Sequence, residues 1–178
     1  MKKHTLRKAA TGLAAITAAF GFVLAFTSPA SAGASTVTPR SVTYYQFKDL
    51  NNGKCLDAGG QVNGSVVQQY TCNGTVNQQW ALRATDSGYF QLVVASSGRC
   101  MEVANSSQSE QAFVQIEDCD SGYNQQWTKG ASTVSGWSQL VTRHSGKCLS
   151  PIDLGSVDRT REVQYSCSFS GYQQWNQS

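Results

Sequence analysis

The sequence predicts an all-β domain built from three copies of one unit. Three observations support this prediction. The same set of residues recurs three times along the chain, and six cysteines fall at matching places within the copies. Short segments of alternating polarity, separated by Gly, Asn and Ser, are frequent, whereas no long segment has apolar residues at helical spacing.

The three copies cover residues of about 43–86, 87–134 and 135–178. The two cysteines of a copy are 17, 19 and 19 positions apart, and the second precedes the tryptophan of a Gln-Gln-Trp triplet by 8 positions each time. Self-similarity at a fixed period indicates one structural unit used repeatedly. Each copy is therefore expected to close its own disulfide. The expected pairs are Cys55–Cys72, Cys100–Cys119 and Cys148–Cys167.

Four short strands are expected in each copy, or about twelve in all. Residues 44–47, 89–94 and 111–117 combine aromatic or β-branched side chains with alternating polarity. Units of this length also suit propeller blades, but three blades are too few for a propeller. The prediction is a β-trefoil, with Trp80, Trp127 and Trp175 in a shared core.

The N-terminus has the pattern of a secretory signal peptide. Four basic residues precede an apolar stretch, and residues 28–32 read Ser-Pro-Ala-Ser-Ala, a small-residue cleavage site. A membrane anchor is the alternative, because the apolar run approaches the length of a span. We expect a signal peptide over residues 1–32, a flexible leader over 33–42, and a secreted, extracellular protein with no membrane association after cleavage.

Charge and residue counts argue against several function classes. Without the signal segment the chain has 10 basic and 11 acidic residues, about −1, which offers no basic face for nucleic acid. Six paired cysteines, no Cys-x-x-Cys and one remaining histidine, His144, predict no metal site and no cofactor. No pair of carboxylates and no nucleophile turn stands out, so we expect a protein without catalytic activity.

With these motifs in view, the chain resembles the ricin B-type lectins and the family 13 carbohydrate-binding modules over about residues 43–177. The resemblance implies a shallow sugar site in a repeat, where a carboxylate and amides bind hydroxyls and an aromatic ring stacks on the sugar. Repeat one matches this pattern at every position. Its implied sugar-binding residues are Asp57, Gln68, Tyr70, Asn77 and Gln78.

Repeat two keeps only part of the pattern. Glu102 stands in place of the aspartate and Glu117 in place of the aromatic residue, while Gln115, Asn124 and Gln125 remain. We expect weak binding there or none, because Glu117 has no stacking face; Tyr123 is a candidate substitute.

Repeat three departs further from the pattern. Ser150, Val163 and Tyr172 replace the aspartate, the glutamine and the asparagine, although Tyr165 and Gln173 remain, and Asp153 lies nearby as a partial substitute. We expect a structural repeat without a sugar site.

The sequence therefore predicts a secreted lectin for galactose- or xylose-type glycans, acting mainly through repeat one. Such a protein would work alone or beside a separate secreted hydrolase. The alternative is a β-trefoil that binds proteins, such as a hydrolase inhibitor or an accessory subunit of a secreted enzyme, since a fold alone does not decide function.

Overall fold

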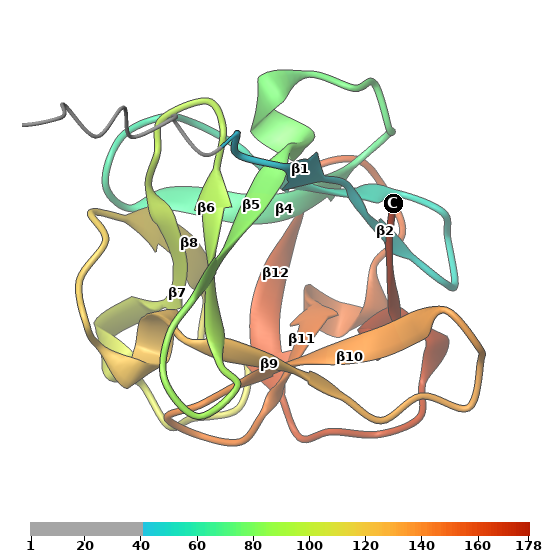
Figure 1. The fold of residues 1–178 in the computed structure, drawn as a ribbon. Coiled ribbons are helices and arrows are strands. Elements are labelled where there is room, and N and C mark those ends of the chain that lie inside the picture. Colours follow the sequence, from blue (N-terminus) through green and yellow to red (C-terminus); the bar gives the residue numbers. More distant parts are fainter. Residues whose placement is uncertain (1–40) are drawn as a thin grey trace, which may run out of the picture. The chain divides into compact units, whose positions relative to one another are not determined.

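The structure, a computed structural model, describes residues 41–178. The predicted signal peptide and residues 33–40 of the predicted leader lie outside this part. Thirteen strands and five short 3-10 helices make up the fold (Figure 1). The strands are β1 (Tyr44–Tyr45), β2 (Phe47–Asp49), β3 (Cys55–Ala58), β4 (Ser65–Tyr70), β5 (Trp80–Ala84), β6 (Phe90–Val94), β7 (Cys100–Val103), β8 (Val114–Glu117), β9 (Trp127–Gly130), β10 (Trp137–Thr142), β11 (Cys148–Pro151), β12 (Thr160–Tyr165) and β13 (Trp175–Gln177). The helices are η1 (Val76–Gln78), η2 (Ala104–Ser106), η3 (Tyr123–Gln125), η4 (Ile152–Leu154) and η5 (Gly171–Gln173).

Six strands form a closed barrel, with β1 and β2 counted as one strand. β5 pairs with β1 and β6, β9 pairs with β6 and β10, and β13 pairs with β10 and β2. β1 and β2 are two parts of one barrel strand interrupted at Gln46, so the thirteen strands correspond to the twelve expected. Closure leaves no free sheet edge in the barrel.

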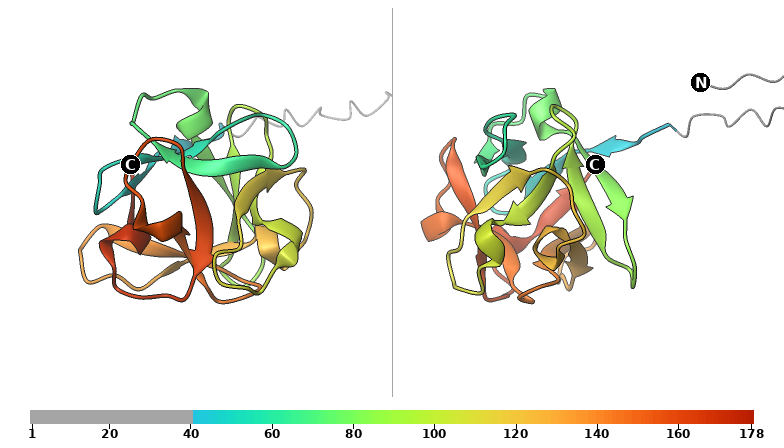
Figure 2. Two further views of the ribbon diagram at one scale, coloured as in Figure 1. Left: turned by 180° about the vertical axis from the view of Figure 1, so that it is seen from behind. Right: turned by 90° about the vertical axis from the view of Figure 1, so that its left-hand side faces the viewer.

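Three hairpins cover one end of the barrel. They are β3–β4, β7–β8 and β11–β12, and β4 also pairs with both β8 and β12. The left view of Figure 2 shows the three repeats as three lobes around the middle of the domain. This arrangement is the predicted β-trefoil, and it brings loops of different repeats side by side.

The tryptophans lie in the core as predicted, each almost completely buried. The Trp80 Nε1 donates to the carbonyl of Leu56 at 3.1 Å, and the Trp127 Nε1 donates to the carbonyl of Met101 at 3.0 Å. The Trp175 Nε1 has no acceptor among the described residues. The disulfides are Cys55–Cys72, Cys100–Cys119 and Cys148–Cys167, one in each repeat as expected. Three disulfides in so small a domain are typical of extracellular proteins.

The turn before the first cysteine of each repeat depends on glycine. Gly53, Gly98 and Gly146 have φ values of 71°, 71° and 68°, a left-handed conformation that glycine adopts without steric cost. Each glycine N–H donates to the carbonyl four residues earlier. The recurrent Gly-(Lys or Arg)-Cys sequence is thus a turn that aligns the following hairpin strand.

One core position breaks the three-fold pattern. Glu162 of β12 stands where the other two repeats have the buried valines Val67 and Val114, five positions before the second cysteine. Its side chain is fully buried, and neither carboxyl oxygen has a hydrogen-bond partner among the described residues. Burial, reinforced by the negative charge of Asp49, raises the pKa of Glu162 well above its ordinary value.

Candidate functional site

The repeat-one site is organised around Asp57 of β3. Asp57 is opposite Gln68 in the β3–β4 register, so both side chains emerge on the same face of the hairpin. The Gln68 Nε2 donates to Asp57 Oδ1 at 3.0 Å. Only 6% of Asp57 is exposed, and the carboxylate is therefore held in one orientation at the base of the site.

The environment of Asp57 shifts its ionisation. Burial raises the pKa of this carboxyl above its ordinary value, and the negative charge of Asp158 adds to the rise. The amides of Gln68 and Gln78 act in the opposite direction because they stabilise the ionised form. A bound hydroxyl that donates to Asp57 would act as these amides do.

The structure gathers four of the five predicted residues around one open cavity of about 670 Å³. Asp57, Gln68, Tyr70 and Asn77 line it. The Oδ1 of Asn77 is buried and has no hydrogen-bond donor among residues 41–178. These four residues supply a carboxylate, two amides and a tyrosine ring, which suit the hydroxyls and apolar face of a sugar.

Gln78, the fifth predicted residue, lies behind the cavity rather than on its lining. It is fully buried and does not line the cavity. Its Oε1 accepts the N–H of Asn73 at 2.9 Å, and its Nε2 donates to the carbonyl of Thr71 at 3.1 Å. Gln78 therefore fixes the chain after β4 and stands behind Asp57, where it supports the carboxylate.

Sequence reasoning missed several residues of this cavity. Asn73, Thr75 and Val76 come from a loop of the same repeat, and Arg159 comes from repeat three. The loop residues lie between the predicted positions, whereas nothing in the sequence links Arg159 to a site a hundred residues earlier.

In repeat two the carboxylate is already occupied by protein groups. Glu102 Oε1 accepts from Gln115 Nε2 at 3.0 Å, and Oε2 accepts from Asn124 Nδ2 at 3.1 Å and Gln125 Nε2 at 3.0 Å. Glu102 is only 7% exposed. The predicted second-site residues do come together, but they bind one another. Glu117 lies at this cluster as well, with Oε2 at 3.5 Å from Gln115 Nε2.

Tyr123, the possible substitute platform of repeat two, is engaged by a cation. The Arg143 guanidinium lies 4.0 Å from the ring centroid of Tyr123 and 4.6 Å from that of Tyr89. Arg143 also pairs with Asp86. A guanidinium held between two aromatic rings and a carboxylate covers a face on which a sugar would stack.

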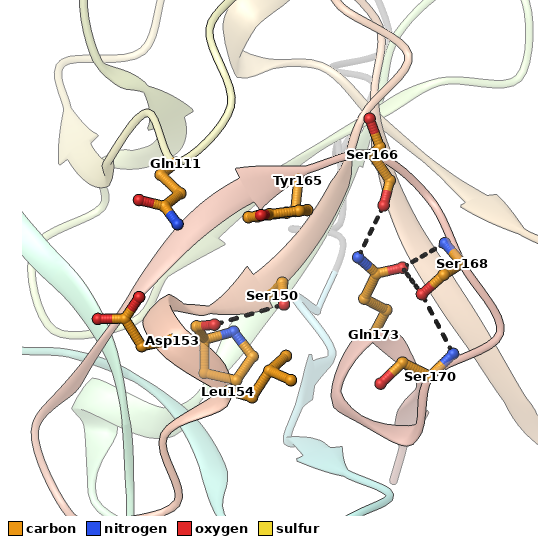
Figure 3. A pocket seen from close by; sticks show the side chains of 10 residues that line it. Gln111, Ser150, Asp153, Leu154, Tyr165, Ser166, Ser168, Ser170 and Gln173 are labelled. Carbon is orange, nitrogen blue, oxygen red and sulfur yellow. Dashed lines mark hydrogen bonds between the residues drawn. The ribbon is translucent and has the colours of Figure 1, made fainter.

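Repeat three carries an open cavity of about 520 Å³ at the position equivalent to the site of repeat one (Figure 3). Tyr165 and Asp153 line it, and Ser150 forms part of its base. The Ser150 Oγ donates to the carbonyl of Pro151 at 3.4 Å, and Gln173 is committed to residues of its own loop, including the N–H of Ser168 at 2.6 Å. Val163 is buried and Tyr172 does not line the cavity.

Residues 41–178 contain neither a candidate metal site nor a membrane-spanning helix. In that part of the chain no group of three or more His, Cys, Asp or Glu side chains could hold a metal ion. No helix there is long and apolar enough to cross a membrane.

Comparison with known proteins gives the family of this domain. The model of the ricin-type β-trefoil lectin domain matches residues 43–175. The chain belongs to the ricin-type β-trefoil lectin family. Family membership supports carbohydrate binding and a binding rather than a catalytic domain. A search of curated proteins found no match.

Some of the similar solved structures match this domain over their whole length, and others match it only over part of a larger chain. The designed three-fold symmetric protein ThreeFoil is 37% identical, with a TM-score of 0.72 over 75% of this chain and 96% of that one. An exo-β-1,3-galactanase from Clostridium thermocellum is 28% identical, with a TM-score of 0.73 over 78% of this chain but only 30% of that one. A Macrolepiota procera ricin B-like lectin in complex with lactose, 15% identical, has a TM-score of 0.67 over 79% and 98% of the two chains and shows the fold alone.

Proposed function

We propose that this protein is a secreted lectin that binds galactose- or xylose-type glycans through the cavity of repeat one. The observation that carries the proposal is Asp57, a nearly buried carboxylate with Gln68 beside it, at the base of an open cavity. Two neighbouring hydroxyls of a pyranose can donate to this carboxylate while Tyr70 covers an apolar face of the ring.

The choice among the repeats follows from which polar groups are free. In repeat one, the Asp57 carboxylate lines the open cavity and accepts from Gln68 through Oδ1, and Asn77 Oδ1 makes no hydrogen bond within residues 41–178. In repeat two, both Glu102 oxygens are bound to amides, and a ligand would have to displace them. In repeat three, no carboxylate lies at the base. Repeat one is therefore the principal site.

Galactose-type ligands are also favoured by the likeness to the galactanase from Clostridium thermocellum, since part of that enzyme has this fold at 28% identity. The same likeness suggests a role beside a separate secreted hydrolase that acts on the bound polysaccharide. Secretion itself rests on the signal peptide expected over residues 1–32 and on the three disulfides.

A protein-binding role is the second candidate, and repeat three is the observation in its favour. Leu154 and Tyr165 are 55% and 41% exposed beside the cavity, and Phe169 is 66% exposed nearby in sequence. Exposed apolar side chains of this size are typical of contacts with proteins.

A glycan array with the secreted protein tests the two candidates, with Asp57→Ala and Asp153→Ala as a matched pair. Each of the two bonds from ligand hydroxyls to the carboxylate contributes about 1.5–3 kcal/mol, so loss of Asp57 should weaken binding by at least about a hundredfold. Asp153→Ala removes an exposed carboxylate that lines the repeat-three cavity and should leave binding unchanged. Absence of any glycan binding by the folded protein would instead favour the protein-binding role.

A further inference from the structure

Arg159 reaches the repeat-one cavity from repeat three, and the backbone around it is fixed there. Its N–H donates to the carbonyl of Gln69 at 2.9 Å. The preceding residue, Asp158, accepts from Lys54 Nζ at 2.6 Å and from the N–H of Thr71 at 2.8 Å. The loop before β12 is thus anchored on repeat one, and the position of Arg159 at this cavity is part of the fold.

The backbone at this position does not favour an arginine. Three equivalent residues, one in each repeat, donate an N–H to the neighbouring hairpin and have positive φ: Gly64 (78°), Gln111 (59°) and Arg159 (70°). Repeat one has glycine there, which shows that the fold requires no side chain. A residue with a Cβ is unfavourable in this conformation. Since Arg159 is also exposed, the fold gains nothing from its side chain.

The charge of Arg159 has no partner among residues 41–178. Five arginines lie within residues 41–178, and four of them engage a side chain: Arg83 with Gln91, Arg99 with Asn63, Arg143 with Asp86, and Arg161 with the Phe113 ring. The Arg159 guanidinium makes no hydrogen bond or ion pair with any described residue.

Asp158 precedes Arg159 in the chain and Asp57 lines the same cavity, and neither carboxylate forms an ion pair with Arg159. Asp158 is paired with Lys54. Asp57, at the base of the same cavity, is bound by Gln68 and forms no ion pair with Arg159. The cavity therefore presents a hydrogen-bond acceptor at its base and an unpaired cation on its lining.

We propose that the repeat-one cavity selects an anionic glycan, in which Asp57 accepts sugar hydroxyls and Arg159 donates to a carboxylate or sulfate. This proposal rests on the sugar-binding function proposed above. A guanidinium matches both anions because it donates two parallel N–H groups. The charge of Asp57 repels the anion and that of Arg159 attracts it, which fixes the direction in which the sugar lies.

The test is titration calorimetry with matched methyl glycosides: galactose against galacturonate, and xylose against glucuronate, which is xylose with a carboxylate added. Comparison of galactose 6-sulfate with galacturonate shows whether the site prefers a sulfate or a carboxylate. One charge-assisted contact predicts about tenfold tighter binding of an anionic member than of its neutral partner. Added salt should reduce this preference, since the contact is exposed.

Arg159→Gly and Arg161→Gln are the matched variants. Arg159→Gly installs the residue of the equivalent position in repeat one and relieves the positive φ, so the fold is retained; a midpoint of urea unfolding that is not lowered verifies this. It should abolish the preference for anionic ligands. Arg161→Gln also removes one positive charge, but from a residue that does not line the cavity and whose guanidinium lies over the Phe113 ring, and it should keep the preference.

The outcomes separate this inference from the proposed function. Equal binding of neutral and anionic members, lost in Asp57→Ala, overturns the role of Arg159 and leaves the lectin site standing. Equal loss of preference in both arginine variants also overturns it, because net charge alone would then explain the effect. No binding of any member overturns both proposals.

Discussion

Replacing Glu162 by valine should stabilise the protein, and increasingly so as the pH rises. The substitution installs the residue that the other two repeats have at this place, Val67 and Val114. A buried polar group without a partner costs about 1–3 kcal/mol, and an ionised one more. The lost side-chain atoms leave a small cavity, which costs about 1 kcal/mol. A net gain of up to about 2 kcal/mol is expected at acidic pH.

The pH dependence follows from the direction of the pKa shift. Folding raises the pKa of Glu162, so between its ordinary value of 4.5 and its folded value the native protein holds a proton that the unfolded chain has released. The free energy of unfolding of the wild type therefore falls as the pH rises through this range. Burial also raises the pKa of Asp49 from 3.8 to about 6. This shift lowers the free energy of unfolding by about 3 kcal/mol as the pH rises through that range, and it does so in wild type and variant alike.

Urea unfolding followed by fluorescence of the buried tryptophans, with the disulfides intact, measures both effects between pH 4 and pH 8. Glu162→Gln is the control, because it removes the ionisable group but leaves polar atoms unpaired. Its free energy of unfolding should no longer show the pH dependence that comes from Glu162, and at low pH it should gain less stability than Glu162→Val. A variant Glu162→Val that is less stable than the wild type, or a difference that is the same at pH 4 and pH 8, would refute the reasoning.

The remaining predictions concern the core, a disulfide and the sugar site. Trp80→Ala should lower the free energy of unfolding by about 3–5 kcal/mol, because a fully buried ring that bonds the carbonyl of Leu56 is removed; an unchanged melting temperature would contradict its place in the core. Replacing both Cys100 and Cys119 by alanine should cost about 3 kcal/mol of stability by freeing a 19-residue loop in the unfolded chain, measured by thermal melting against the wild type. Glycan affinity should fall as the pH drops through the raised pKa of Asp57, because only the ionised carboxylate accepts from both hydroxyls; calorimetry at pH 4 and pH 7 that gives equal affinity would exclude this role.

The sequence by itself was sufficient for the architecture. The recurrence of Gly, Cys, Gln and Trp at nearly constant spacing indicated three units, and the disulfides, the buried tryptophans and the trefoil agree with it. The relation of Asp57 to Gln68 could also be read from the sequence. Both belong to one hairpin, where pairing and the alternation of side chains bring them to the same face.

Only the tertiary structure decided the features that depend on contacts between repeats. Arg159 reaches the repeat-one cavity because β4 pairs with β12, ninety residues later, and Arg143 covers Tyr123 because the two meet from separate repeats. Glu162 is buried because its strand places it where valine stands in the other repeats. The physical reason is common to these cases. A spacing pattern records which residues recur within a unit, whereas burial and pairing of charge depend on which side chains of other units lie opposite.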